Sequence, residues 1–91
     1  MGYLDLAKLP NGEYDLDKIA ESAYNSYQYA RYVLQARFLP GEEAILTNVH
    51  WTTMYAINVL NQRWPEGEEV IKTDPYYLAR YREQFGRELG G

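Results

Sequence analysis

The chain has 91 residues, ten tyrosines, no cysteine and a net charge of −4. Hydrophobic residues make up 46% of it and charged residues 24%, which is typical of one globular domain and excludes wholesale disorder. The absence of cysteine excludes disulfides and thiol chemistry, and the negative charge argues against nucleic acid as a partner.

Residues 1–14 are predicted to be an N-terminal cap. Residues 1–8 read as a shortened helix, and residues 10–12 (PNG) read as a turn. The start has no basic stretch followed by an apolar one, so we do not expect a signal peptide. No apolar run approaches the roughly 20 residues that cross a bilayer. We therefore expect no membrane partner and a cytoplasmic location.

From residue 15 onward the sequence repeats with a period of 26 residues. Segments 37–48 (RFLPGEEAILTN) and 63–74 (RWPEGEEVIKTD) align without a gap. The identical pairs are Arg37/Arg63, Gly41/Gly67, Glu42/Glu68, Glu43/Glu69, Ile45/Ile71 and Thr47/Thr73. Similarity at a fixed spacing is typical of repeat proteins. We predict a single domain, 1–91, with repeat units 15–40, 41–66 and 67–91.

Each unit is predicted to contain a short helix, a tight turn and a longer helix. Short helices are expected near residues 15–20, 41–46 and 67–72, and long helices near residues 22–38, 48–64 and 74–88. The long helices begin at Ser22, Asn48 and Asp74, whose side chains can accept hydrogen bonds from a first helical turn. An apolar stripe with helical spacing runs to Phe38 and Trp64. The predicted fold class is all-α, a small solenoid-like array of alternating short and long helices.

Residues 45–59 favour a competing structure. They are rich in β-branched side chains, which taken alone indicate a strand. The equivalent residues 23–34 are typical of a helix, and equivalent units are expected to fold alike. The repeat therefore favours a helix here too.

A longer pattern spans the second unit and the start of the third. It consists of Tyr55-Ala56, Val59-Leu60, Arg63-Trp64-Pro65-Glu66-Gly67-Glu68 and Asp74-Pro75. This pattern resembles a short helical repeat, YA-x-x-V-[IL]-x-x-RWPEAE with a following Asp-Pro turn, of uncharacterised bacteriophage-encoded proteins. Gly67 replaces the alanine, and the first copy has Phe38-Leu39-Pro40 in place of Trp-Pro-Glu. The resemblance covers about residues 22–81. It implies an α-helical array and a viral origin, and it carries over no catalytic residue.

Two arginines and two glutamates recur in the repeat. Arg37 and Arg63, with Glu43 and Glu69, form a charged ladder that can clamp a carboxylate or a phosphate. In the alternative interpretation, each arginine lies at the end of a long helix, where the dipole favours a cation, and pairs with the acid of the next short helix. We favour this structural interpretation because both residue types recur in each unit.

Two adjacent positions of the repeat change from copy to copy. Tyr24, His50 and Tyr76 share one position, and Asn25, Trp51 and Tyr77 share the next. Positions that face a ligand vary in this way, whereas core positions keep their character. We predict that these six residues, the aromatic column, are the partner-binding site. In the alternative interpretation they pack between neighbouring helices.

No motif indicates catalysis, a metal or a cofactor. His50 is the only histidine, and no set of residues has the spacing of metal ligands. The hydroxyl residues suggest no catalytic triad, and Gly41 and Gly67 are isolated rather than part of a phosphate-binding loop. We predict a non-enzymatic protein without catalytic residues, metal or cofactor.

The leading functional prediction is a module that binds another protein, because tyrosine and tryptophan often anchor interfaces. With a viral origin, it would be a regulatory or counter-defence factor in the host cytoplasm. Partly apolar end faces would also allow a homo-oligomer. The alternative is single-stranded nucleic-acid binding by stacked tyrosines and tryptophans with Arg31, Arg37, Arg63, Arg80 and Arg82. A third interpretation is a small-molecule pocket lined by Tyr24, Tyr27 and Trp51.

Overall fold

A computed structural model of the chain describes residues 6–86, and this part is helical, with no strand. The short helices are α1 (Leu16–Ala20), α3 (Leu39–Ile45) and α5 (Pro65–Ile71). The longer ones are α2 (Ala23–Gln28), which continues into η2 (Tyr29–Leu34), then α4 (Val49–Tyr55), which continues into η3 (Ala56–Leu60), and α6 (Pro75–Phe85). The predicted all-α fold is confirmed, and of the helix predicted near residues 48–64 the part 49–60 is helical.

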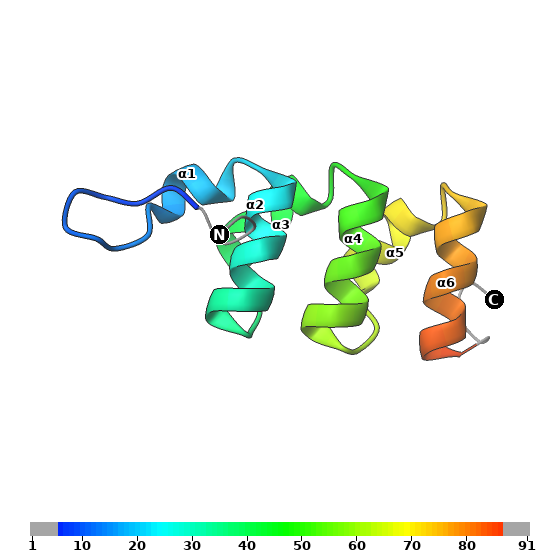
Figure 1. Ribbon diagram of the computed structural model, residues 1–91. Helices are drawn as coiled ribbons and strands as arrows, with labels where there is room; N and C mark the ends of the chain where they lie inside the picture. The colour runs from blue at the N-terminus through cyan, green and yellow to red at the C-terminus, as the bar shows by residue number, and fades with distance from the viewer. Residues whose placement is uncertain (1–5, 87–91) are drawn as a thin grey trace.

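The long helices stand next to one another along the longest dimension of the molecule. α2 contacts α4, and α4 contacts α6, while α3 packs on α2 and α5 on α4. The extents are 49 × 20 × 19 Å. In Figure 1 the N-terminal ends of α2, α4 and α6 lie along the same upper edge. Residues near the start of each long helix are therefore brought to one side of the molecule.

The beginnings of the long helices lie where the capping residues predict them. Ser22 Oγ accepts the N–H of Asn25 at 3.1 Å, and Asn48 Oδ1 accepts the N–H of Trp51 at 3.1 Å. Asp74 caps α6 in the same way. Each cap satisfies an N–H group that has no partner inside the helix.

The ends of the long helices differ from the prediction. The first two end at Leu34 and Leu60, four residues before the predicted 38 and 64. Their last turns widen into a π-helix, and the next residues, Gln35 and Asn61, have φ of 56° and 52°. This left-handed conformation ends a helix. Pro65 consequently opens α5, where the missing N–H costs nothing, instead of ending the helix before it.

The two ends of the chain also depart from the prediction. Residues 6–8 are not helical, although the prediction placed them in a shortened helix. Lys8 instead forms an isolated β-bridge with Tyr14. The predicted turn lies between them, and in it the N–H of Gly12 donates to Leu9 O at 2.9 Å. Residues 1–5 of the predicted shortened helix lie outside the described residues. α6 ends at Phe85, so the part of the predicted helix 74–88 beyond residue 86 also lies outside them.

The core contains the same kinds of residue at intervals of 26 positions. Ile19, Ile45 and Ile71 are fully buried in successive short helices. Ser26 Oγ donates to Ile19 O at 3.0 Å, and Thr52 Oγ1 donates to Ile45 O at 2.8 Å, so a buried hydroxyl ties each long helix to the short helix before it. None of the helices within residues 6–86 combines the length and the apolar character needed to cross a membrane.

Candidate binding surface

An arginine, a glutamate and a tyrosine connect neighbouring helices in the middle of the molecule. Arg37 donates to Glu42 from Nε at 2.7 Å and from Nη2 at 3.0 Å. Tyr55 Oη donates to the same carboxylate at 2.7 Å and accepts the backbone N–H of Phe38 at 2.8 Å. We call this set of contacts a joint, because it ties the η2–α3 connection to the next long helix.

The same joint occurs 26 residues later. Arg63 donates to Glu68 at 3.1 and 3.3 Å. Tyr81 Oη donates to Glu68 at 2.8 Å and accepts the N–H of Trp64 at 2.7 Å. The glutamates therefore already occupy both guanidinium groups, as the structural interpretation of the arginines requires.

Two details of the predicted charged ladder were wrong. The acids that pair with the arginines are Glu42 and Glu68, and the neighbouring Glu43 and Glu69 are exposed. Adjacent residues on a helix point in different directions, so only one acid of each pair can face the tyrosine. The arginines lie in the connections after η2 and η3 rather than in the helices, so the helix dipole is not their main partner.

The electrostatics of the joints follow from burial and pairing. The hydrogen bonds from Arg63 hold the pKa of Glu68 below its ordinary value. Burial raises the pKa of Tyr81 to about 12, and it raises the pKa of Tyr55 further. At neutral pH the Glu68 carboxylate is therefore ionised and the Tyr81 phenol is protonated, which fits the direction of the hydrogen bond between them.

The first unit lacks this joint. Tyr29 stands in register with Tyr55, but its hydroxyl makes no hydrogen bond to another described residue. Leu16 occupies the position of Glu42 and cannot accept a hydrogen bond from the tyrosine.

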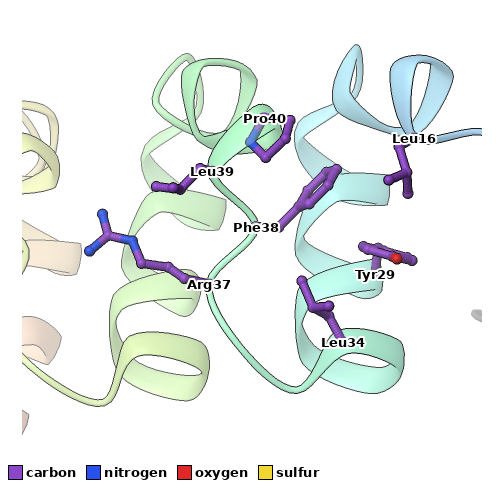
Figure 2. Close-up of a pocket in the computed structure, with 7 residues that line it drawn as sticks. All are labelled: Leu16, Tyr29, Leu34, Arg37, Phe38, Leu39 and Pro40. Carbon is purple, nitrogen blue, oxygen red and sulfur yellow. The ribbon is translucent and has the colours of Figure 1, made fainter.

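An open apolar groove of about 290 Å³ lies at the same place. Its lining consists of Leu16, Tyr29, Leu34, Arg37, Phe38, Leu39 and Pro40. In Figure 2 Phe38 points toward the side that carries Leu16 and Tyr29, and Arg37 points away from it. Leu16, Leu34 and Leu39 are 42%, 42% and 66% exposed. The sequence alone does not predict this groove, although leucine stands at position 16 where the later units have glutamate.

The aromatic column forms a continuous line of rings across α2, α4 and α6. Tyr24 contacts Trp51 with ring centroids 5.2 Å apart, and Trp51 contacts His50 at 4.4 Å. His50 contacts Tyr77 at 5.5 Å, and its Nδ1 lies 2.9 Å from the Tyr77 hydroxyl. Tyr77 contacts Tyr76 at 4.9 Å. The structure thus brings together five of the six predicted residues.

The sixth residue and the middle of the column are less accessible than its ends. Asn25 is half-buried, and its backbone N–H is used by the Ser22 cap. Trp51, His50 and Tyr77 are half-buried, with the Trp51 ring also against Tyr27 at 5.1 Å. Tyr24 and Tyr76 are 43% and 60% exposed. The inner rings therefore pack between helices, while the end rings face solvent.

The two other candidate sites are a metal site and a small-molecule pocket. No group of three or more histidine, cysteine, aspartate or glutamate side chains within residues 6–86 is arranged to hold a metal ion. The rings of Tyr24, Tyr27 and Trp51, considered above as walls of a small-molecule pocket, contact one another directly.

Comparison of the chain with models of protein families, with curated proteins and with solved structures finds no match. The resemblance to the bacteriophage repeat therefore stays a prediction.

Proposed function

We propose that this chain is a short helical-repeat array that binds another protein through the aromatic column and has no catalytic role. The observation that carries the proposal is the line of touching rings across three helices, with an exposed tyrosine at each end. Aromatic side chains that are already held by neighbours lose little freedom on binding, and tyrosine and tryptophan are the most frequent interface anchors.

The repeat part of the proposal is supported by the two joints. They use the same residue types in the same roles, 26 positions apart. In a repeat array each unit contacts only its neighbours, and the outer surface is left free to vary. The column residues differ between units, as a binding surface on such an array would.

The biological setting is part of the same proposal. A small acidic binder of this kind would suit a phage-encoded regulatory or counter-defence factor that acts in the cytoplasm of the host. The apolar groove at Leu16 and Leu39 offers a second contact surface, through which two copies of the chain could associate.

The test is capture of partners from an extract of the source cells. The variant carries Tyr24→Ala and Tyr76→Ala, which remove the two exposed rings and leave the half-buried ones in place. The matched control is Tyr32→Ala, because Tyr32 is also exposed, at 39%, but lies on η2 outside the column. We expect wild type and control to retain the same protein and the double variant to lose it. Equal retention by all three would refute the column as the binding surface.

Single-stranded nucleic acid is the alternative partner. The arginines at 37 and 63 are held by glutamates, so two of the five arginines considered for this function already have an anionic partner. A labelled oligonucleotide titrated at several salt concentrations separates the two functions. Binding that weakens steeply with salt and requires Tyr24 and Tyr76 would favour the nucleic-acid function.

A further inference from the structure

Resting on the proposed function, we infer that the aromatic column takes an extended proline-rich peptide that carries a lysine or an arginine. The ligand would lie across α2, α4 and α6 in the polyproline II conformation. Such peptides are recognised on surfaces lined with aromatic rings, where the preformed helix loses little entropy on binding.

The spacing of packed helices, which sets the spacing of the rings that they carry, is close to the period of such a peptide. Tyr24 and His50 occupy the same position of neighbouring units and are separated by two ring contacts of 5.2 and 4.4 Å through Trp51. His50 and Tyr76 are separated by contacts of 5.5 and 4.9 Å through Tyr77. Equivalent rings are therefore at most about 10 Å apart, which agrees with the ~8–10 Å between packed helices. A polyproline II helix advances about 9.3 Å in its three-residue turn, so one edge of it meets one ring per helix.

The chemistry of the column also fits this ligand. A polyproline II backbone makes no internal hydrogen bonds, so its carbonyl groups need donors from the binding surface. The indole N–H of Trp51 lies in a half-buried side chain at the centre of the column and donates to no other described residue. It can meet a peptide carbonyl between two stacked prolines.

Charge at the ends of the column indicates where the cation of the ligand binds. The protein carries a net charge of −4, and Glu21 is exposed three residues before Tyr24. At the other end, Arg80 already lies over the Tyr76 ring at 6.0 Å from its centroid. The lysine or arginine of the peptide therefore binds near Glu21 and Tyr24.

The experiment uses a peptide of one lysine followed by nine prolines, about 28 Å of polyproline II helix without the lysine. A peptide of the same length and charge with glycine and serine in place of proline is the control. The chain has two tryptophans, and the indole N–H signals of Trp51 and Trp64 are followed by NMR. Trp64 is only 2% exposed and serves as an internal reference.

We expect the Trp51 signal to shift and saturate with the proline peptide, while the Trp64 signal stays in place. Tyr24→Ala and Tyr76→Ala should each weaken binding about threefold to tenfold, and Tyr32→Ala should leave it unchanged. Glu21→Gln should weaken it about twofold to fivefold, with Glu43→Gln as the matched exposed acid.

The ligand class is wrong if the Trp51 signal does not move at millimolar peptide, or if it moves equally with the glycine–serine peptide. The cell-extract capture then separates the two levels of the proposal. Capture that still depends on Tyr24 and Tyr76 means that the column binds a protein of other chemistry. Capture that does not depend on them removes the proposed function together with the ligand.

Discussion

The tyrosines of the joints give a sharp test of what holds neighbouring units together. Tyr55→Phe and Tyr81→Phe each remove one hydroxyl and keep the ring. Tyr29→Phe makes the same change in the first unit, where the hydroxyl has no hydrogen-bond partner among the described residues. The three substitutions are chemically identical and stand in the same register, so differences between them report the hydrogen bonds together with the greater burial of Tyr55 and Tyr81.

The expected loss in the free energy of unfolding follows from the two hydrogen bonds that each of the Tyr55 and Tyr81 hydroxyls makes. Tyr81 is fully buried, and without its hydroxyl the backbone N–H of Trp64 has no acceptor. A buried N–H without a partner costs about 1–3 kcal/mol. The hydrogen bond to the ionised Glu68 is lost as well, and bonds to charged groups contribute about 1.5–3 kcal/mol. The two effects overlap, and we expect a loss of about 2–4 kcal/mol in the free energy of unfolding.

Urea denaturation followed by circular dichroism measures this loss. With a slope of about 2 kcal/mol per molar urea, the middle of the usual range for small proteins, the midpoint should fall by about 1–2 M for Tyr55→Phe and Tyr81→Phe. Tyr29→Phe should change the free energy of unfolding by no more than about 0.5 kcal/mol. Equal losses at all three positions, or losses below about 0.5 kcal/mol at Tyr55 and Tyr81, would show that the joints do not stabilise the fold.

The pH dependence of the second joint and the packing of the core can be tested in the same way. The pKa of Glu68 is lowered in the folded state, so the ionised carboxylate stabilises the fold above its unfolded pKa, and this stabilisation is lost as the pH falls. Urea midpoints measured at decreasing pH should therefore drop in the wild-type protein. They should drop less in Glu68→Gln, which has no carboxylate at this position. Because the pKa of Tyr81 is raised to about 12, stability should fall between about pH 10 and 12, which a circular dichroism titration can follow with Tyr81→Phe as the comparison. Gly67→Ala would place a Cβ 2.6 Å from a ring carbon of the neighbouring tryptophan, and thermal unfolding should show a loss of about 1–3 kcal/mol. Ile45→Asp would bury a carboxylate at a fully buried position and should cost several kcal/mol, so a native-like circular dichroism spectrum and melting temperature would contradict the assigned core.

The helix starts could be predicted because their signals are local. Ser22, Asn48 and Asp74 cap their helices with their own side chains, and the interaction spans only two or three residues. The period of 26 residues then placed the short helices and decided against a strand at residues 45–59. Caps and periodicity depend on the sequence alone, and both led to the observed elements.

The helix ends could not be predicted in the same way. Gln35 and Asn61 adopt the left-handed conformation that glycine usually provides, and glutamine gives no signal for it. The apolar stripe continues at helical spacing through Phe38, so periodicity alone extends the helix too far. Phe38 is buried because the connection folds back over the preceding helix, where its ring lies 5.0 Å from that of Tyr29. Phe38 would be buried either on a longer helix or on a connection that folds back. Only the tertiary packing distinguishes these two possibilities.

Five of the six residues of the aromatic column lie together, as their shared repeat positions suggest, but the burial of each ring could not be predicted. Variation between copies selected Tyr24, Trp51 and Tyr76, and the structure brings them into one line. Whether a ring on that line is exposed depends on its neighbours. The Trp51 ring is in contact with the rings of Tyr24, Tyr27 and His50, whereas Tyr76 has no following unit within the described residues to cover it.

The distribution of identical and variable residues can now be given a physical cause. Positions that are the same in successive units are mostly those with a fixed geometric task. The isoleucines at 19, 45 and 71 fill the core. The glycines at 41 and 67 leave room for a side chain of the preceding long helix or connection. The arginine, glutamate and tyrosine of each joint depend on one another through their hydrogen bonds. A change in any one member leaves another polar group of the joint without its partner, so each joint needs all three residues. The column residues take no part in the joints, so a tyrosine, a histidine and a tyrosine can stand at the same position of successive units without disturbing them.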